Sequence, residues 1–420
     1  MSQATFDREQ ARPGWGTRIK SVLLEKAGAA LMGIPHKGAL TVTFPSGRCR
    51  TLGDASTGEH AFLKLNNFRV LKAAMRRGTL GFAEAYMRGD IEIRDLTALF
   101  RFFLQNRDIF DKANPGIFRR AAQDLAYHMS RPNTREGSQK NIAEHYDLGN
   151  DFYAEWLDPS MTYSSAYFAG QDISLEEAQR AKYQRIMVMA GIGAGHHVLE
   201  IGCGWGGFAE TAARTGAHLR GITLSREQLK YGIDRLERQG LADFGKLVFE
   251  DYRDTRGAFD HVASIEMIEA VGEEHWPDYF KTVHDRLKPG GTAAIQAITI
   301  AERDFEIYKA YPDFIQRYIF PGGMLLTKAV MKEAAAKVGL VLEATDCFRL
   351  DYARTLRIWS QRFIERWDAI AKLGYDEVFK RKWLYYLAYC EAGFTEGTID
   401  VGIYQYRRPS ARDGRSIFPI

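Results

Sequence analysis

The segment VLEIGCGWGGF, residues 198–208, joins an apolar run to a group of closely spaced glycines. Such a loop lets backbone N–H groups approach a ligand, and the amino terminus of a following helix offers further donors. It suits either a nicotinamide dinucleotide for hydride transfer or an adenosyl cofactor for another reaction. Dinucleotide sites usually carry an acidic residue near the end of the second strand. Here that strand ends in GITLSREQ, residues 221–228, so the hydride enzyme is disfavoured.

The flanks of the loop favour the adenosyl cofactor. Glu200 directly precedes the glycines, and LKPGG, residues 287–291, leads into TAAIQAI. These features are typical of the methyltransferase version of a parallel sheet, which binds S-adenosylmethionine. A tight turn without a ligand is the simpler alternative, and the flanks count against it.

Strand and helix signals alternate along the second part of the chain. The expected strands are HVLEI, HLRGIT, KLVFE, FDHVASI and TAAIQAI, and the expected helices follow Trp205, cover 225–240 and cover 276–287. This alternation predicts an α/β fold with a parallel, doubly wound, Rossmann-like sheet of the class I methyltransferase type.

The chain divides into three predicted regions. Residues 1–125 contain ALTVTF, HAFLKLNNFRVLKAAMRRG and DLTALFRFFLQN, which predict a small mixed α/β domain. Residues 126–139 are polar and include Pro132 and Gly137, so we expect a linker or mobile loop. Residues 140–420 form the predicted catalytic domain.

Composition is that of a folded, soluble protein. The 420 residues are 45% hydrophobic and 26% charged, and no uncharged apolar run is long enough to span a membrane. The start MSQATFDREQ has no signal-peptide core. The four cysteines, at 49, 203, 347 and 390, have neither metal-binding spacing nor a disulfide pattern. We therefore expect a cytoplasmic protein without a metal site.

Charge is uneven along the chain. Residues 1–100 hold 15 Lys plus Arg against 9 Asp plus Glu, a net charge of +6. The whole chain has a net charge of +4, so the remaining residues sum to −2. A basic amino-terminal region suits an anionic surface such as phospholipid headgroups or nucleic acid, although a solvated basic face is the alternative. Neither an aromatic-interleaved basic patch nor an Asn/Asp-Pro-Pro-Tyr type of motif is present, so we expect no nucleic-acid partner.

A set of motifs carries a specific resemblance. In order they are NIAEHYDLGNDFYAEWLDPSMTYSSAYF (141–168), LEIGCGWGG, GITLSREQ, EDYRD (250–254), IEMIEAVG (265–272), LKPGG, RYIFPGG (317–323) and YYLAYCEAGF (385–394). Over residues 125–410 the chain resembles the cyclopropane fatty-acyl-phospholipid synthases and mycolic-acid cyclopropane synthases. Residues 1–125 resemble the amino-terminal lipid-binding domain of the bacterial phospholipid enzymes.

The resemblance implies a reaction, a substrate and a location. The methyl group of S-adenosylmethionine is transferred to the double bond of an unsaturated phospholipid acyl chain, and a cyclopropane ring forms. The protein is then a homodimer, attached peripherally at the inner face of the cytoplasmic membrane through basic and apolar side chains.

The resemblance also implies cofactor residues. They lie in four places: the TYSS motif, the glycine loop with the residue before it, the segment after the second strand, and DYRD. The residues are Tyr163, Ser164, Glu200, Gly202, Gly204, Gly206, Thr223, Leu224, Gln228, Tyr252 and Arg253. The glycine backbone is expected to meet the methionine and ribose portions, and Gln228 to bind adenosine hydroxyls.

A base must remove a proton after methyl transfer. In the resembled family this base is bound bicarbonate. By resemblance Glu269, Tyr352 and the backbone amide of Ile298 hold it, and Ser165 and Gln296 stand where relatives have cysteine and histidine. Both replacements can still donate hydrogen bonds to an anion.

Three further features of the carboxy-terminal part are candidates for contact with the acyl chain. Cys390 stands at the family's marked cysteine and is a candidate catalytic residue, although the alkene reaction needs no covalent enzyme intermediate. RYIFPGG suits an interfacial loop. Aromatic residues recur at helical spacing and suit either a cation-stabilising wall or plain core: Trp359, Phe363, Trp367, Phe379, Trp383 and Tyr386.

Two alternatives to the cyclopropane product stay open. Because Ser165 and Gln296 differ from the family pattern, the enzyme is alternatively a C-methyltransferase that leaves a methyl- or methylene-branched chain. A non-catalytic lipid-binding protein with a retained cofactor fold is the alternative from a different class.

Overall fold

A computed structural model describes residues 35–109, 133–135, 137 and 148–410. The chain divides into two compact units, residues 1–119 and 120–420, and each is described by itself. Most of the predicted linker lies outside the described residues, as do the first 34 residues with part of the basic region.

The amino-terminal unit contains a four-stranded sheet in the order β2-β1-β3-β4. Its elements are β1 (Gly38–Thr43), β2 (Cys49–Asp54), β3 (His60–Leu65), α2 (Arg69–Met87), β4 (Ile91–Ile93) and α3 (Leu96–Gln105). Strand β1 alternates between buried and partly exposed residues toward its end, and its neighbour β3 runs parallel to it. Helix α2 is interrupted at Gly78, where φ of 56° is a backbone conformation that glycine adopts without strain.

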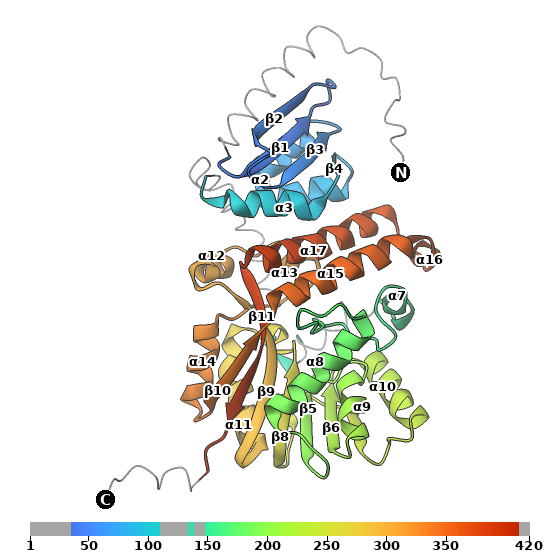
Figure 1. Cartoon of the computed structure of the whole chain (residues 1–420), viewed down its shortest axis with the longest axis vertical. Helices are drawn as coiled ribbons and strands as arrows, with labels where there is room; N and C mark the ends of the chain where they lie inside the picture. Colours follow the sequence, from blue (N-terminus) through green and yellow to red (C-terminus); the bar gives the residue numbers. More distant parts are fainter. Residues whose placement is uncertain (1–34, 110–132, 136, 138–147, 411–420) are drawn as a thin grey trace, which may run out of the picture. The chain divides into compact units, whose positions relative to one another are not determined.

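The larger unit is built on a seven-stranded sheet in the order β10-β11-β9-β8-β5-β6-β7 (Figure 1). The strands are β5 (His197–Ile201), β6 (His218–Thr223), β7 (Gly245–Phe249), β8 (Phe259–Ile265), β9 (Leu287–Ile300), β10 (Val341–Cys347) and β11 (Ile399–Arg407). Neighbours among β5–β9 are parallel, whereas β11 runs antiparallel to both β9 and β10. The predicted α/β methyltransferase-type fold is confirmed.

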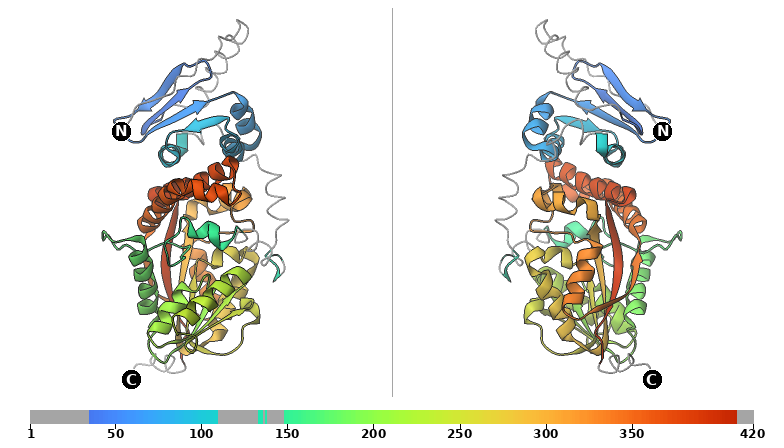
Figure 2. Two further views of the ribbon diagram at one scale, coloured as in Figure 1. Left: turned by 90° about the vertical axis from the view of Figure 1, so that its right-hand side faces the viewer. Right: turned by 90° about the vertical axis from the view of Figure 1, so that its left-hand side faces the viewer.

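Helices cover both faces of this sheet (Figures 1 and 2). One layer contains α8 (Leu175–Ala190), α9 (Gly207–Arg214) and α10 (Arg226–Arg238), and the other contains α11 (Trp276–Arg286) and α14 (Lys328–Lys337). Helix α8 starts at a capping box in which Ser174 and Glu177 satisfy each other's backbone N–H groups. The central strands β5 and β8 bury successive residues on both faces, at residues 198–201 and 262–264, because helices cover both sides of the sheet.

A further group of helices lies beyond one end of the strands. It comprises α7 (Asn150–Ala154), α12 (Phe305–Ala310), α13 (Phe314–Tyr318), α15 (Arg349–Glu365), α16 (Trp367–Lys372) and α17 (Glu377–Glu396). Helices α15 and α17 lie side by side (Figure 1). Phe152 forms T-shaped contacts with Trp156, Phe363 and Trp383, so these rings form an aromatic core.

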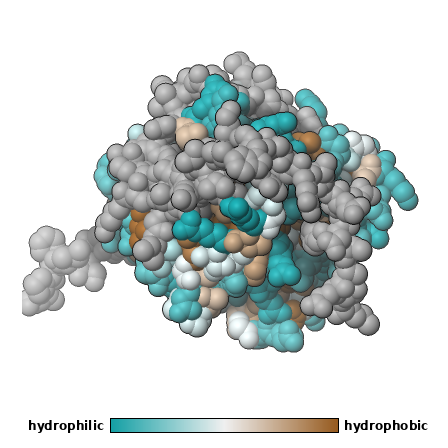
Figure 3. Space-filling model, turned by 90° about the horizontal axis from the view of Figure 1, so that it is seen from above, coloured by the Kyte–Doolittle hydropathy of each residue, from teal (hydrophilic) through white to brown (hydrophobic). Residues whose placement is uncertain are grey.

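Large hydrophobic side chains on the described surface are scattered. The most exposed are Val188 at 70%, Leu350 at 58% and Ile364 at 53%. In the face shown in Figure 3, hydrophobic residues lie singly or in small groups among hydrophilic ones. Within the described residues, no helix combines the length and the hydropathy needed to cross a bilayer.

Candidate functional site

The glycine loop has the backbone conformation that its sequence requires. Strand β5 ends at Ile201, and Gly202, Gly204 and Gly206 follow with φ values of 84°, 50° and 80° before α9 begins. A side chain at Gly202 would collide with Met267, whereas one at Gly204 would meet nothing within 4 Å. Gly204 therefore faces open space.

Glu200 supports the assignment of this loop to a ligand. The residue is 2% exposed, and its Oε2 atom has no hydrogen-bond partner among the described residues. Burial raises the pKa of Glu200 to about 8, against the opposing charge of Lys182. A buried carboxyl oxygen without a partner, next to exposed glycine backbone, fits a ligand that brings donors, as the amino and hydroxyl groups of S-adenosylmethionine do.

The end of β6 lies beside the loop. Backbone N–H groups of Gly202 and Cys203 both donate to Ile222 O, at 3.0 and 2.9 Å. Directly after Ile222, the Thr223 hydroxyl donates to Gln228 Oε1 at 3.3 Å. The structure thus brings together the glycines and the 223–228 segment, including Leu224, that we predicted for the cofactor.

DYRD forms a short turn, η1 (Tyr252–Asp254). Tyr252 is 8% exposed, and its hydroxyl has no partner in the described part of the chain. The Arg253 guanidinium instead binds Asp251, with Nε and Nη2 at 2.8 and 2.6 Å from its two carboxylate oxygens. That carboxylate holds the Arg253 side chain, which leaves Tyr252 as the more available cofactor contact of the two.

Glu266 is the centre of a second cluster that joins three elements. It follows β8, and its Oε1 atom accepts hydrogen bonds from Ser164 Oγ at 2.8 Å, Ser165 N at 2.9 Å and Gln296 Nε2 at 2.6 Å. Its Oε2 atom accepts a fourth from the Tyr352 hydroxyl at 2.8 Å. The four donors fix the position of the Glu266 carboxylate.

Three of these donors are residues that the resemblance assigned to bicarbonate. Ser165, Gln296 and Tyr352 all donate to Glu266. Ser165 does so through its backbone N–H, while its hydroxyl donates to Ala166 O. Because a protein carboxylate already occupies their donors, these residues do not fit a bound bicarbonate in this arrangement.

Glu269 lies in the same loop and differs from Glu266 in its surroundings. Its Oε1 accepts the backbone N–H of Ile298 at 2.5 Å, and its Oε2 is buried without a hydrogen-bond partner in the described structure. Burial, followed by the charge of Glu266, raises the pKa of Glu269 to about 8. The two carboxyl groups of this loop therefore have different surroundings, and that of Glu269 favours the protonated form.

Tyr163, Trp359 and Tyr386 connect this cluster to the aromatic helices. The hydroxyls of Tyr163 and Tyr386 lie 2.8 Å apart, and the Tyr163 ring is 5.4 Å from that of Trp359. Trp359 also forms a T-shaped contact with Tyr352 at 6.2 Å. Of the predicted aromatic residues, Trp359 and Tyr386 lie beside the site, whereas Phe363, Phe379 and Trp383 pack around Phe152 as core.

Cys390 lies on α17 among tyrosines. Its removal from water, followed by the nearby Asp313 carboxylate, raises the pKa of the thiol. Cys390 in turn contributes to the raised pKa values of Tyr352 and Tyr386. The protonated thiol is a poor nucleophile, which agrees with a reaction that needs no covalent intermediate.

RYIFPGG packs against the site rather than forming a free loop. Ile319 is 3% exposed, and the Phe320 ring lies 6.0 Å from that of Tyr386. Just after this segment, Met324 N donates to the backbone oxygen of Glu269 at 2.8 Å. The segment therefore supports the loop that carries both glutamates.

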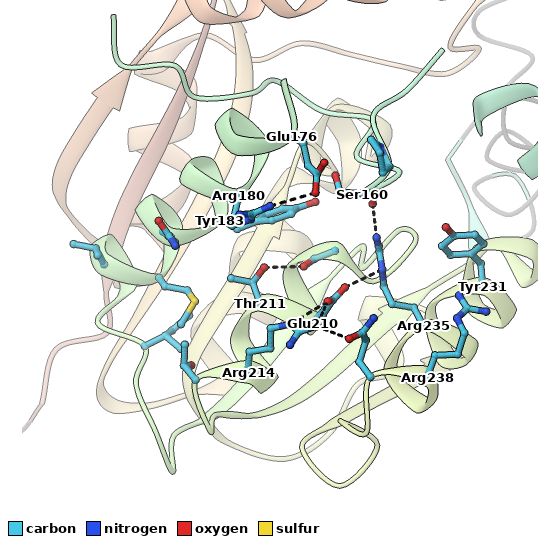
Figure 4. Close-up of a pocket in the computed structure, with 18 residues that line it drawn as sticks. Ser160, Glu176, Arg180, Tyr183, Glu210, Thr211, Arg214, Tyr231, Arg235 and Arg238 are labelled. Atoms are coloured by element: carbon cyan, nitrogen blue, oxygen red, sulfur yellow. Dashed lines mark hydrogen bonds and ion pairs between the residues drawn. The ribbon is translucent and has the colours of Figure 1, made fainter. Parts of the chain in front are cut away.

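A separate hollow of about 650 Å³ lies between α8, α9 and α10 (Figure 4). Three of its arginines contact acidic residues: Arg180 contacts Glu176, while Arg214 and Arg235 both contact Glu210. None of the predicted site residues lines it. We assign it no ligand.

Sequence reasoning missed two central residues. Glu266 stands in IEMIEAVG, where we considered only Glu269, and Lys182 lies on α8, a helix that we did not predict individually. A second glutamate three residues from the first was the available signal for Glu266. A single lysine in a helical segment gives no such signal.

Comparison with known proteins identifies related sequences. Residues 133–404 match the family described as mycolic acid cyclopropane synthetase. A tuberculostearic acid methyltransferase of Mycobacterium tuberculosis is 41% identical over 342 residues, which cover 79% of both chains. A cyclopropane-fatty-acyl-phospholipid synthase of Escherichia coli is 33% identical over 342 residues, with 81% of this chain and 86% of that protein covered.

Solved structures show the same likeness. A cyclopropane synthase from Mycobacterium tuberculosis aligns with a TM-score of 0.60 and 30% identity, over 64% of this chain and 98% of its own. A mycolic acid cyclopropane synthase in complex with SAH and CTAB aligns with a TM-score of 0.61 and 28% identity, again over 64% of this chain and 98% of its own.

Proposed function

Because this chain belongs to the mycolic acid cyclopropane synthetase family, we propose that it methylates the double bond of unsaturated phospholipid acyl chains and leaves a methylene-branched product. The family relationship establishes the coarser activity, which is transfer of a one-carbon group from S-adenosylmethionine to lipid acyl chains. The product and the phospholipid substrate are the proposed part.

The observation that carries this proposal is the Glu266 carboxylate held by Ser164, Ser165, Gln296 and Tyr352. These donors fix the orientation of the Glu266 carboxylate, which supports its role as the base. S-adenosylmethionine supplies a sulfonium methyl group. The surrounding aromatic side chains exclude water and tolerate the positive charge that methyl transfer leaves on the acyl chain.

The atoms balance without any further reagent. The S–CH₃ bond breaks, the alkene electron pair forms a new C–CH₃ bond, and the neighbouring carbon becomes a cation. A hydride moves from the branching carbon to that cation, which gives the more stable tertiary cation. Glu266 then accepts a proton from the new methyl group, and the electron pair of the broken C–H bond forms the C=CH₂ double bond of the methylene branch.

Hydrogen bonding of Glu266 favours this order of events. Because four hydrogen bonds already occupy the lone pairs of its two carboxylate oxygens, we propose that the hydride shift precedes proton capture. The relative named as a tuberculostearic acid methyltransferase, at 41% identity, supports a branched product.

Cyclopropanation is the second candidate. It is supported by the relative named as a cyclopropane-fatty-acyl-phospholipid synthase, at 33% identity. In that case Glu266 removes the methyl proton before any hydride shift, and the electron pair closes the ring. The two products have equal mass, so mass alone does not separate them.

The test is incubation of the purified full chain with methyl-labelled S-adenosylmethionine and vesicles of monounsaturated phosphatidylglycerol, followed by proton NMR of the extracted lipid. Vinylic =CH₂ signals are expected, and upfield cyclopropane signals establish the second candidate instead. Cofactor binding without consumption indicates the non-catalytic lipid-binding protein and overturns both.

We further propose that the protein reaches its substrate as a peripheral protein at the inner membrane face. The basic balance of residues 1–100 supports this proposal. Co-sedimentation with anionic but not zwitterionic vesicles, weakened by salt, is the expected result.

A further inference from the structure

Lys182 is a fully buried lysine in the middle of α8. Its exposed fraction is 0%, which is rare for this residue type because an ammonium loses its hydration on burial. It forms no ion pair within 4 Å in the described part of the chain. A conventional salt bridge therefore does not explain its position.

The direct polar contact of Lys182 is with the base cluster. Its Nζ donates to Ser164 Oγ at 3.0 Å, and Ser164 Oγ donates to Glu266 Oε1 at 2.8 Å. The ammonium also lies 4.4 Å from the centre of the Tyr183 ring. A continuous chain of donors thus runs from Lys182 through one hydroxyl to the carboxylate of Glu266.

Three carboxyl groups face Lys182 from different elements. Glu266 follows β8, Asp158 follows α7 and Glu200 is the penultimate residue of β5, next to the glycine loop, and all three favour the charged lysine. Burial is the larger effect and lowers the pKa of Lys182 to about 7. Lys182 therefore changes charge near neutral pH while its hydroxyl partner remains bound to Glu266.

We propose that Lys182 is a positioning residue whose ammonium group, acting through the Ser164 hydroxyl, orients the Glu266 carboxylate for proton removal. The inference rests on the proposed role of Glu266. Loss of the lysine charge above pH 7 replaces a charge-assisted hydrogen bond to Ser164 by a weaker one, so Ser164 and Glu266 are held less firmly in position. In the wild type, kcat falls as pH rises through about 7.

Two substitutions separate charge from structure. Lys182→Met keeps the length of the side chain without its charge, and Lys182→Arg keeps the charge at every working pH. We expect kcat of Lys182→Met to fall roughly 10- to 100-fold and to lose its dependence on pH near 7. Lys182→Arg keeps its kcat between pH 7 and 9, where the wild type declines. Arg180→Met, on the exposed side of the same helix, is the control and behaves as wild type.

Thermal unfolding distinguishes a role of Lys182 in catalysis from a role in stabilising the fold. A lysine whose folded-state pKa is lowered destabilises the fold most below pH 7, and the penalty disappears as pH rises toward 10.5. Lys182→Met is therefore expected to unfold at an equal or higher temperature than the wild type at pH 6, although it is much less active. Its affinity for S-adenosylmethionine, measured by calorimetry, is expected to stay within about 3-fold.

The inference is overturned if folded Lys182→Met keeps wild-type kcat and an unchanged pH profile. If that variant does not fold, Ser164→Ala tests the same link with the lysine in place. We expect Ser164→Ala to have a lower kcat than the wild type and to show no fall of kcat above pH 7. A variant that keeps both the wild-type kcat and its fall above pH 7 counts against the inference. An inactive wild type instead refutes the proposed function.

Discussion

Gln296 Nε2 lies 2.6 Å from Glu266 Oε1, while the backbone N–H of Glu266 donates to the Gln296 carbonyl at 2.8 Å. Glu266, directly after β8, and Gln296, within the adjacent parallel strand β9, thus contact each other through both backbone and side chain. In addition, Gln296 Nε2 donates to Ser164 Oγ at 3.1 Å. The glutamine therefore holds together both the base and one of its donors.

Replacing Glu266 tests its role as the base. Glu266→Gln keeps the shape of the side chain but removes the proton acceptor, so we expect kcat to fall by about 10²–10⁴-fold. Cofactor affinity should change little. Release of S-adenosylhomocysteine and lipid NMR measure the two halves of the reaction. Wild-type turnover in this variant would contradict the assignment.

Glu266→Gly tests the site as an anion cradle. Removal of the carboxylate leaves the Ser164, Ser165, Gln296 and Tyr352 donors directed at a space shaped for a carboxylate-like anion. Added bicarbonate should restore part of the lost activity in a saturable manner, and chloride at equal ionic strength should not. No response to bicarbonate would show that these donors do not form an anion site without Glu266.

Substitutions at Ser165 and Tyr352 should have different effects on kcat. Ser165→Ala removes a hydroxyl that donates to Ala166 O, and the backbone N–H that reaches Glu266 remains. We therefore expect its kcat to stay within about 3-fold of wild type. Tyr352→Phe removes a hydroxyl that donates to Glu266 Oε2, and a loss of about 10-fold or more is expected. Equal effects of both substitutions would contradict the observed geometry.

Much of the fold was predictable because local patterns and packing agree. HVLEI, HLRGIT and FDHVASI are each a strand over the predicted residues, since short segments with β-branched and other apolar residues, alternating with helical segments, suit a doubly covered parallel sheet. The DLTALFRFFLQN helix likewise begins with Asp95 as an N-cap, as α3 does in the structure.

The site was predictable only in outline. Motif order placed Tyr352 and Gln296 near an anion, but it could not show that the anion is the carboxylate of Glu266. Such an arrangement depends on three contacts with sequence separations of 30, 86 and 102 residues. Lys182 was hidden for a related reason, because its burial follows from tertiary packing of α8 rather than from local sequence.

Cys390 should tolerate replacement. The pKa of its thiol is raised by burial and by Asp313, so the reactive thiolate is scarce at neutral pH. We expect Cys390→Ser to keep kcat within about 5-fold and iodoacetamide to inactivate the wild type slowly. Rapid alkylation that abolishes turnover would instead indicate an activated thiol in direct contact with substrate.

His261, which is not part of the glutamate cluster, should make the free energy of unfolding depend on pH. Its Nδ1 lies 2.8 Å from Thr292 Oγ1, and its Nε2 lies 3.0 Å from His196 Nδ1. Burial, followed by His196, lowers the pKa of His261 to about 4, while Asp260 opposes and Lys288 adds to the shift. The folded state therefore keeps this ring neutral at pH values where the unfolded chain takes up a proton.

The sign of the effect follows from that difference. Below pH 6.5 the unfolded chain binds more protons at this position, so the free energy of unfolding falls as pH decreases from about 6.5 to 4. Since the ring is only partly buried, we expect a loss of about 1–2 kcal/mol over this range. His261→Gln should show a smaller loss in urea unfolding at pH 4.5 relative to pH 7, with His284→Gln on α11 as the control. An identical pH dependence of wild type and His261→Gln would show that this ring is not the group that titrates.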